Sequence, residues 1–132
     1  MNIGLISNDS KKELMQNFCI AYKGILSRHE LYATGSTGRM IEDVTNLTVH
    51  KFIPGQLGGI RQMAAQIECN EMDTIIYLRD PSSPEEESGK DFLYITKLCD
   101  ISNIPLATNI ATAEMLILGI ERGDLSWRDL YK

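Results

Sequence analysis

Short apolar runs alternate with longer runs of helical periodicity along the whole chain, and this alternation most constrains the fold. The short runs are rich in β-branched residues, which is typical of buried strands. They lie at Asn2–Ser7, His29–Thr34, Leu47–Ile53 and Asp73–Arg79, with a last short one within Asn103–Asn109. The runs between them repeat apolar residues every three to four positions, which is typical of a helix with one buried face.

The longer runs predict helices that pack on a sheet. They cover Asn8–Arg28, Gly35–Thr45, Ile60–Ile67, Lys90–Ser102 and Thr112–Arg122. Asn8, Asp9 or Ser10 can cap the first helix. We expect Thr112 to cap the last helix and Gly123 to end it.

Strands that alternate with helices form a parallel sheet with helices on both faces. Right-handed crossovers then give a three-layer, doubly wound (Rossmann-like) α/β fold with a parallel five-stranded sheet. The 132 residues suit a single domain over 1–132. We expect Leu47–Ile53 nearer an edge and Asp73–Arg79 near the centre. The acidic, proline-containing segment Asp80–Gly89 predicts a solvated loop, and the tail Asp124–Lys132 is either a short helical turn or a contact strip.

Charge and cysteine content exclude several classes of protein. A net charge of −5 argues against nucleic-acid binding, which needs a basic face, but leaves room for a small anion. The start lacks a signal peptide, and no apolar run reaches the ~18 residues of a membrane helix, so we expect a cytoplasmic protein without a membrane partner. Cys19, Cys69 and Cys99 are expected as buried free thiols, and no Cys/His cluster suggests a metal.

Polar segments follow each predicted strand, in the sequences SND, TGSTG, PGQLGG, RDPSS and TNIAT. The carboxyl ends of parallel strands share one edge of the sheet, where such folds bind ligands. The sequence therefore predicts one convergent pocket at this rim.

Thr34–Gly38 is the sharpest motif of the rim. Gly35 and Gly38 let the backbone turn and approach a ligand, and the next helix offers free N–H groups to an anion. Hydroxyls come from Thr34, Ser36 and Thr37. Lys12 can add a positive charge beside them. We call Lys12 with Thr34–Gly38 the cradle. The residues alone also fit a helix-capping turn and an ordinary surface lysine.

Two carboxylates and a glycine-rich loop complete the rim. Asp9 and Asp80 end two strands, where they can orient a lysine or move a proton, or serve only as a helix cap and a turn initiator. Pro54–Ile60 contains three glycines but no acid, base or nucleophile.

The segments LYATGSTG, PGQLGG, RDP and NIPLATNIATAE, in this order and at these separations, resemble methylglyoxal synthase over nearly the whole chain. The same domain occurs in carbamoyl phosphate synthetase and the purine-pathway bifunctional cyclohydrolase, but a free-standing chain is more similar to the synthase branch. The resemblance implies conversion of dihydroxyacetone phosphate to methylglyoxal and phosphate by a carboxylate base, without a metal or organic cofactor. It also implies a homohexamer, often inhibited by phosphate.

The resemblance implies a phosphate site at positions that this chain mostly retains. These are Lys12, Thr34, Gly35, Ser36, Thr37, Gly38 and Gly55, with Ser36 replacing a usual threonine and Pro54 a usual serine. Asp9 and Asp80 match carboxylates of the family active site. Asp91 matches a further aspartate if the alignment is shifted by about one residue.

The proton-transfer positions implied by the resemblance are altered. Ile60 stands where the family has its aspartate base, Asn8 replaces one histidine, and Glu85–Ser88 lacks a second. A positioned base typically contributes roughly 10²–10⁴-fold, and isoleucine cannot move a proton. Arg61, next to Ile60, is a new charge that can bind an anion.

Three functions stay open from the sequence. The main interpretation is a protein that binds a phosphorylated small metabolite, dihydroxyacetone phosphate or phosphate, and is catalytically impaired. The alternative is an active methylglyoxal synthase whose base is a rearranged carboxylate, Asp9, Asp80, Asp91 or a glutamate of the acidic loop. A more remote one is a lyase or isomerase for another phosphorylated substrate.

Overall fold

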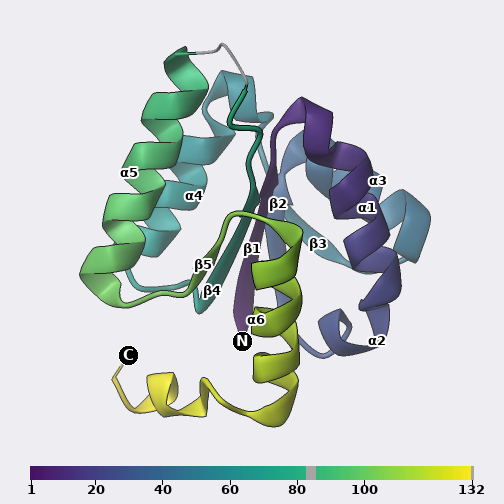
Figure 1. Cartoon of the computed structure of the whole chain (residues 1–132), viewed down its shortest axis with the longest axis vertical. Coiled ribbons are helices and arrows are strands. Elements are labelled where there is room, and N and C mark those ends of the chain that lie inside the picture. The colour runs from purple at the N-terminus through teal and green to yellow at the C-terminus, as the bar shows by residue number, and fades with distance from the viewer. Residues whose placement is uncertain (83–85, 132) are drawn as a thin grey trace.

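A parallel five-stranded sheet in the order β3-β2-β1-β4-β5 runs through the middle of the protein (Figure 1). The structure, a computed structural model, describes residues 1–82 and 86–131. The strands are β1 (Asn2–Ser7), β2 (Glu30–Thr34), β3 (Val49–Phe52), β4 (Thr74–Leu78) and β5 (Leu106–Ala107). The predicted α/β fold is confirmed. As expected, β3 forms an edge, while β4 is interior and fully buried beside the central β1.

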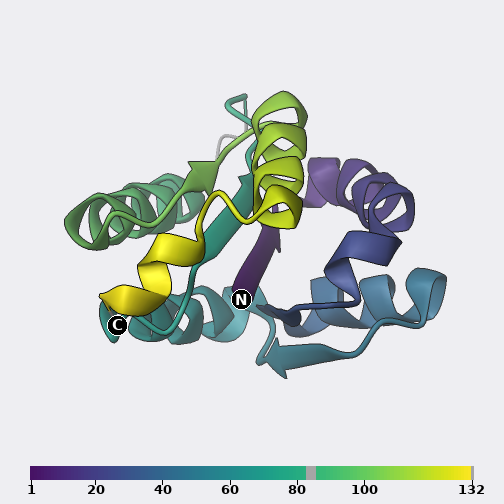
Figure 2. The same cartoon turned by 90° about the horizontal axis from the view of Figure 1, so that it is seen from below.

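Helices cover both faces of the sheet (Figures 1 and 2). Their bounds are α1 (Lys12–Ala21), α2 (Lys23–Leu26), α3 (Gly35–Thr45), α4 (Gly59–Glu68), α5 (Glu86–Ser102) and α6 (Ile110–Arg122), with 3₁₀ turns η1 (Asp9–Lys11), η2 (Gly55–Leu57) and η3 (Ser126–Leu130). Phe18 of α1, Ile41 of α3 and Ile117 of α6 share one buried cluster. Met63 of α4 and Ile95 of α5 belong to the cluster on the other face. The strand ends therefore open between two helical layers.

Several predicted helix ends are wrong. The first helix is interrupted at Tyr22, between α1 and α2. Helix α5 begins at Glu86 rather than Lys90, so part of the expected loop is helical. The cap of α6 is Asn109, not Thr112, because Asn109 is extended and its Oδ1 accepts the Thr112 N–H at 3.1 Å. The end at Gly123 is confirmed by its left-handed φ of 82°.

Burial of the thiols was predicted correctly in two cases. Cys19 and Cys99 are buried, and burial raises the pKa of each thiol to about 12. Cys69 is exposed, because it lies past the end of α4, after the last inward-facing residue, Ile67. Within residues 1–82 and 86–131, no helix is long and apolar enough to cross a membrane.

The C-terminal turn η3 is fixed by a buried arginine that sequence reasoning missed. Arg128 is 4% exposed, and its Nε donates to Oδ1 of Asp73, which is fully buried. The other guanidinium nitrogens donate to the Asn70 side chain and to the backbone oxygens of Met72, Ser102 and Asn103. These hydrogen bonds hold the tail under the amino ends of the strands.

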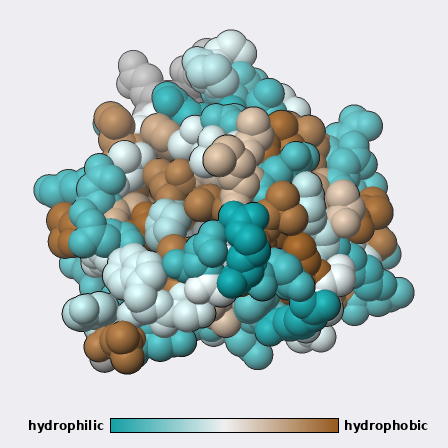
Figure 3. Space-filling view, turned by 60° about the horizontal axis from the view of Figure 1, so that its bottom comes forward, coloured by the Kyte–Doolittle hydropathy of each residue, from teal (hydrophilic) through white to brown (hydrophobic). Residues whose placement is uncertain are grey.

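On the face seen in Figure 3, apolar residues lie scattered among polar ones.

Candidate functional site

The Lys12 ammonium joins α1 to the first turn of α3. Its Nζ donates to Thr37 Oγ1 at 3.0 Å and to Ser36 Oγ at 3.4 Å. Asp9 Oδ1 is more distant, at 3.9 Å. The structure therefore brings a full positive charge to the hydroxyl groups of the cradle, as the sequence suggested.

The backbone of the cradle is the start of α3. Thr34 ends β2 in an extended conformation, and α3 begins at Gly35 with no acidic residue in its first turn. Thr34 and Thr37 are 5% and 1% exposed, so both are fixed in place. N–H groups at such a helix start lack partners within the helix and favour an anion.

Packing against β3 leaves little room for a side chain at either cradle glycine. A Cβ on Gly38 would lie 2.6 Å from Lys51 Cγ, and one on Gly35 would lie 3.1 Å from the Phe52 carbonyl oxygen. Arg39 Nη2 would be 3.4 Å from that same Gly35 Cβ. Arg39 is thus a further cation beside the cradle, and its spacing of four residues from Gly35 on one helix was the missed signal.

The glycine-rich loop is pressed against the cradle. A Cβ on Gly59 would lie 2.0 Å from the Ile53 carbonyl oxygen and 3.1 Å from the Thr34 methyl group. The same Ile53 oxygen accepts the Gly35 N–H at 3.4 Å. Gly58 has a φ of 109°, which a residue with a side chain rarely adopts. The loop shape therefore depends on these glycines, and it holds the next residue, Ile60, close to the cradle.

Ile60 places an apolar side chain at the end of the glycine-rich loop. Its side chain is half-buried and packs against the cluster of α4 and α5. A Cβ on Gly55 would meet Ile60 Cγ1 at 3.7 Å and the Thr34 methyl group at 3.8 Å. An apolar side chain thus stands beside Gly55, where the resemblance implies a carboxylate.

Asp80 lies in a network with the start of the first helix. Its Oδ2 accepts the Ser10 hydroxyl at 2.6 Å, and its Oδ1 accepts the Ser82 hydroxyl and N–H. The Ser10 bond first, and then the Ser82 bonds, lower the pKa of the Asp80 carboxyl from 3.8 to about 2. Asn8 Oδ1 accepts the Asp80 N–H at 2.8 Å, so Asn8 and Ser10 bond to Asp80 and do not cap the helix.

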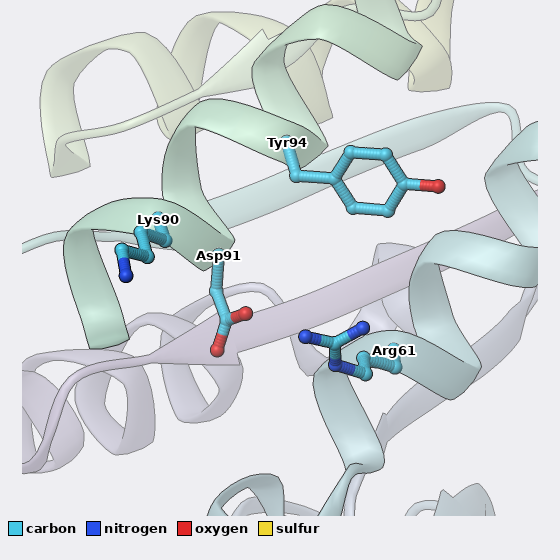
Figure 4. Close-up of a pocket in the computed structure, with 4 residues that line it drawn as sticks. All are labelled: Arg61, Lys90, Asp91 and Tyr94. Carbon is cyan, nitrogen blue, oxygen red and sulfur yellow. The ribbon is translucent and has the colours of Figure 1, made fainter.

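The other two candidate carboxylates lie apart from this network. The Asp9 side chain is 93% exposed. Asp91 lines a cleft of about 280 Å³ with Arg61, Lys90 and Tyr94, between the first turn of α4 and the second and third turns of α5 (Figure 4). The structure describes neither Glu85 nor the side chains of residues 86–88, so the glutamate candidates fall outside the described part of the chain.

The rim also carries Arg79, which follows β4. Its guanidinium carbon lies 4.2 Å from the centre of the Phe92 ring, an attractive cation–aromatic contact. Within the part of the chain that the structure describes, no three His, Cys, Asp or Glu side chains are placed to hold a metal ion.

Comparison with known proteins agrees with the fold and the motifs. A model of the MGS-like domain family matches residues 15–108. Methylglyoxal synthase of Caldicellulosiruptor saccharolyticus is 56% identical over 98% of this chain and 92% of that protein. The Listeria welshimeri methylglyoxal synthase is 52% identical over 98% of this chain and 96% of its own length.

A solved structure shows that the similarity to methylglyoxal synthases extends to the fold. The crystal structure of methylglyoxal synthase from Elizabethkingia anophelis matches with a TM-score of 0.78 and 30% identity, covering 88% of this chain and 76% of that chain. The family model matches more than half of the residues of this chain, and both relatives are identical to it at more than half of the aligned positions. The chain therefore belongs to the methylglyoxal synthase family.

Proposed function

We propose that this chain binds a phosphorylated small metabolite, dihydroxyacetone phosphate or inorganic phosphate, in the cradle, and that its turnover of dihydroxyacetone phosphate is strongly impaired. The observation that carries the proposal is the Lys12 ammonium, 3.0 Å from Thr37 Oγ1 at the start of α3. A lysine charge, hydroxyl donors and free helix N–H groups together match the oxygens of a phosphate. Hydrogen bonds to a charged group contribute about 1.5–3 kcal/mol each.

The impaired turnover follows from the candidate bases. An efficient general base has a pKa near the operating pH. The Asp80 carboxyl, with a pKa of about 2, is a weak base, and both of its oxygens already accept serine donors. Asp9 extends into solvent, and Asp91 lies in the α4–α5 cleft beside Arg61. Ile60 has no group that accepts a proton.

Two measurements on one preparation test the proposal. Isothermal titration calorimetry with inorganic phosphate and with dihydroxyacetone phosphate should show binding at millimolar ligand or below. Incubation with dihydroxyacetone phosphate should release methylglyoxal and phosphate at a rate close to the uncatalysed background. No heat of binding at millimolar ligand contradicts the binding function, whereas rapid methylglyoxal formation supports an active synthase with a rearranged base.

We also propose that the chain assembles as a homo-oligomer, the hexamer that the resemblance implies. Trp127, Leu130 and Tyr131 of the tail are 47%, 80% and 74% exposed, although Arg128 fixes this segment against the domain. Rigidly held apolar side chains of this kind favour contact with another protein surface. Size-exclusion chromatography with light scattering should give a mass of several chains, and a monomer at all concentrations would contradict assembly.

A further inference from the structure

The cleft between α4 and α5 has a charge pattern that the cradle does not explain. It measures about 280 Å³ and is lined by Arg61, Lys90, Asp91 and Tyr94. In Figure 4 the Asp91 carboxylate faces the Arg61 guanidinium, and Lys90 extends on the other side of Asp91. Among the side chains that the structure describes here, two cations stand against one carboxylate, in a chain whose net charge is −5.

Arg61 keeps hydrogen-bond capacity for a ligand. A guanidinium has five N–H donors in a planar fork, more than one carboxylate can use. Arg61 is exposed, so the remaining donors can be reached from solvent. Tyr94 is 44% exposed and projects beside Arg61 in Figure 4, which adds a hydroxyl donor and an aromatic wall.

The cleft and the cradle are neighbours along the same rim. Gly59 is pressed against the Thr34 methyl group, and Arg61 follows Gly59 by two residues in the first turn of α4. Ile60 lies between Gly59 and Arg61 in the chain, and a Cβ on Gly55 would meet its Cγ1 at 3.7 Å. A small molecule held in the cradle would thus extend past an apolar side chain toward the Arg61 fork.

We propose that the cleft is an anion subsite, in which Arg61 binds a second anionic group, carboxylate or phosphate, of the ligand whose phosphate occupies the cradle. This inference rests on the proposed phosphate-binding function. Phosphorylated metabolites with a second anionic group would then bind more tightly than dihydroxyacetone phosphate, which has only its phosphate, and Arg61 would be a specificity-determining residue. Asp91, which faces Arg61 in Figure 4, would position the guanidinium.

Matched ligand pairs test the subsite by calorimetry at low salt. Glycerol 3-phosphate and 3-phosphoglycerate differ by a carboxylate, and fructose 6-phosphate and fructose 1,6-bisphosphate differ by a phosphate. In at least one pair the member with two anionic groups should bind on the order of tenfold more tightly. The pair that shows the preference identifies the second group as carboxylate or phosphate.

Charge-removing variants assign the preference to Arg61. Arg61→Gln should abolish this preference while leaving the affinity for the member with phosphate as its one anionic group within about twofold. Arg122→Gln, the same change at the far end of α6, should keep it. Equal binding within both pairs, or a preference that survives Arg61→Gln, overturns the subsite and leaves the phosphate site standing. No binding of any of the four ligands overturns both.

Discussion

The Lys12 ammonium and the Thr37 hydroxyl lie 3.0 Å apart, so a charge from α1 is fixed over the first turn of α3. Thr37 is almost fully buried, while Lys12 is 29% exposed along its side chain. The buried hydroxyl sets the position, and the accessible ammonium supplies the charge. A phosphate in the cradle would therefore meet a donor that is already oriented.

Removal of the Lys12 charge should weaken anion binding. For Lys12→Met we expect the dissociation constant of inorganic phosphate to rise on the order of tenfold, because one charge-assisted hydrogen bond is lost. Calorimetry at constant ionic strength measures the change. Lys23→Met, on the exposed helix α2, removes the same charge away from the rim and should have no effect. A similar loss in both variants would indicate only a long-range charge effect.

Restoring a carboxylate at position 60 should raise turnover. Ile60→Asp places an acid beside Gly55, in the first turn of α4, where the helix dipole favours negative charge. We expect methylglyoxal formation at least about tenfold above the parent, toward the roughly 10²–10⁴-fold of a positioned base. The rate should rise further when Asn8→His is added.

The control for this gain is Ile60→Asn, which has the shape of aspartate but cannot act as a carboxylate base. A colorimetric assay of methylglyoxal compares the rates of the variants at the same concentration of dihydroxyacetone phosphate. Equal rates for the aspartate and asparagine variants would show that the altered position does not limit the reaction.

The Asp80 network should make stability fall at low pH. Folding lowers the pKa of this carboxyl to about 2, so its contribution is complete above 3.8 and is lost as the pH falls toward 2. Ser10→Ala removes the 2.6 Å bond and should raise the pKa of Asp80. Carboxyl chemical shifts followed by NMR from pH 5 to about 1.5 would measure it.

Ser27→Ala is the matched control for that titration, because the Ser27 hydroxyl donates to the Gly24 carbonyl oxygen. It should leave the pKa of Asp80 unchanged. An Asp80 that titrates near 3.8 in the parent protein would contradict the network.

Loss of Arg128 should destabilise the fold severely. Arg128→Ala leaves the fully buried Asp73 without its cation. It also removes the hydrogen bonds that Arg128 donates to the backbone oxygens of Met72 and Asn103. Breaking a buried ion pair costs about 3–5 kcal/mol of unfolding free energy. Urea denaturation followed by circular dichroism measures the loss.

Arg122→Ala is the comparison, since Arg122 pairs with Asp124 at the surface, where both side chains are more than half exposed. An exposed pair contributes about 0–1 kcal/mol. Similar losses for the two arginine variants would contradict the buried role of Arg128.

A methyl group on Gly59 should disturb the cradle through the loop. In Gly59→Ala the new Cβ would overlap the Ile53 carbonyl oxygen, which also accepts the Gly35 N–H. We expect a loss of about 1–3 kcal/mol in unfolding free energy together with weaker phosphate binding. Gly24→Ala meets no atom within 4 Å and should stabilise by about 0.4–1 kcal/mol. Unchanged binding in a folded Gly59→Ala would separate the loop from the cradle.

The sheet was predictable because the strands β1 and β4 at its centre are nearly continuous apolar runs. The helix ends were not predictable, because competing caps decide them. Asn109 and Thr112 both suit a helix start, and only backbone geometry at Asn109 settles the choice. Exposure of Cys69 likewise depends on where α4 ends.

Within the rim, sequence identified the Lys12 and Thr37 positions, which the fold brings together. Contacts between distant segments were not predictable in the same way. Arg128 meets Asp73 across 55 positions, and Arg61 was noted without Tyr94 and Asp91, which come from another helix. Periodicity reports which face of an element is buried, but not which loops meet.

The anchoring of the tail decides how this protein can be attached to a surface. Arg128 ties the last turn beneath the amino ends of the strands, and Met1 lies there too, against His29 at 3.2 Å. In Figure 1 the marked N- and C-terminal ends lie on the opposite side of the molecule from the strand ends that carry the cradle. A tether at either terminus would leave the rim facing outward, a favourable orientation for a metabolite biosensor.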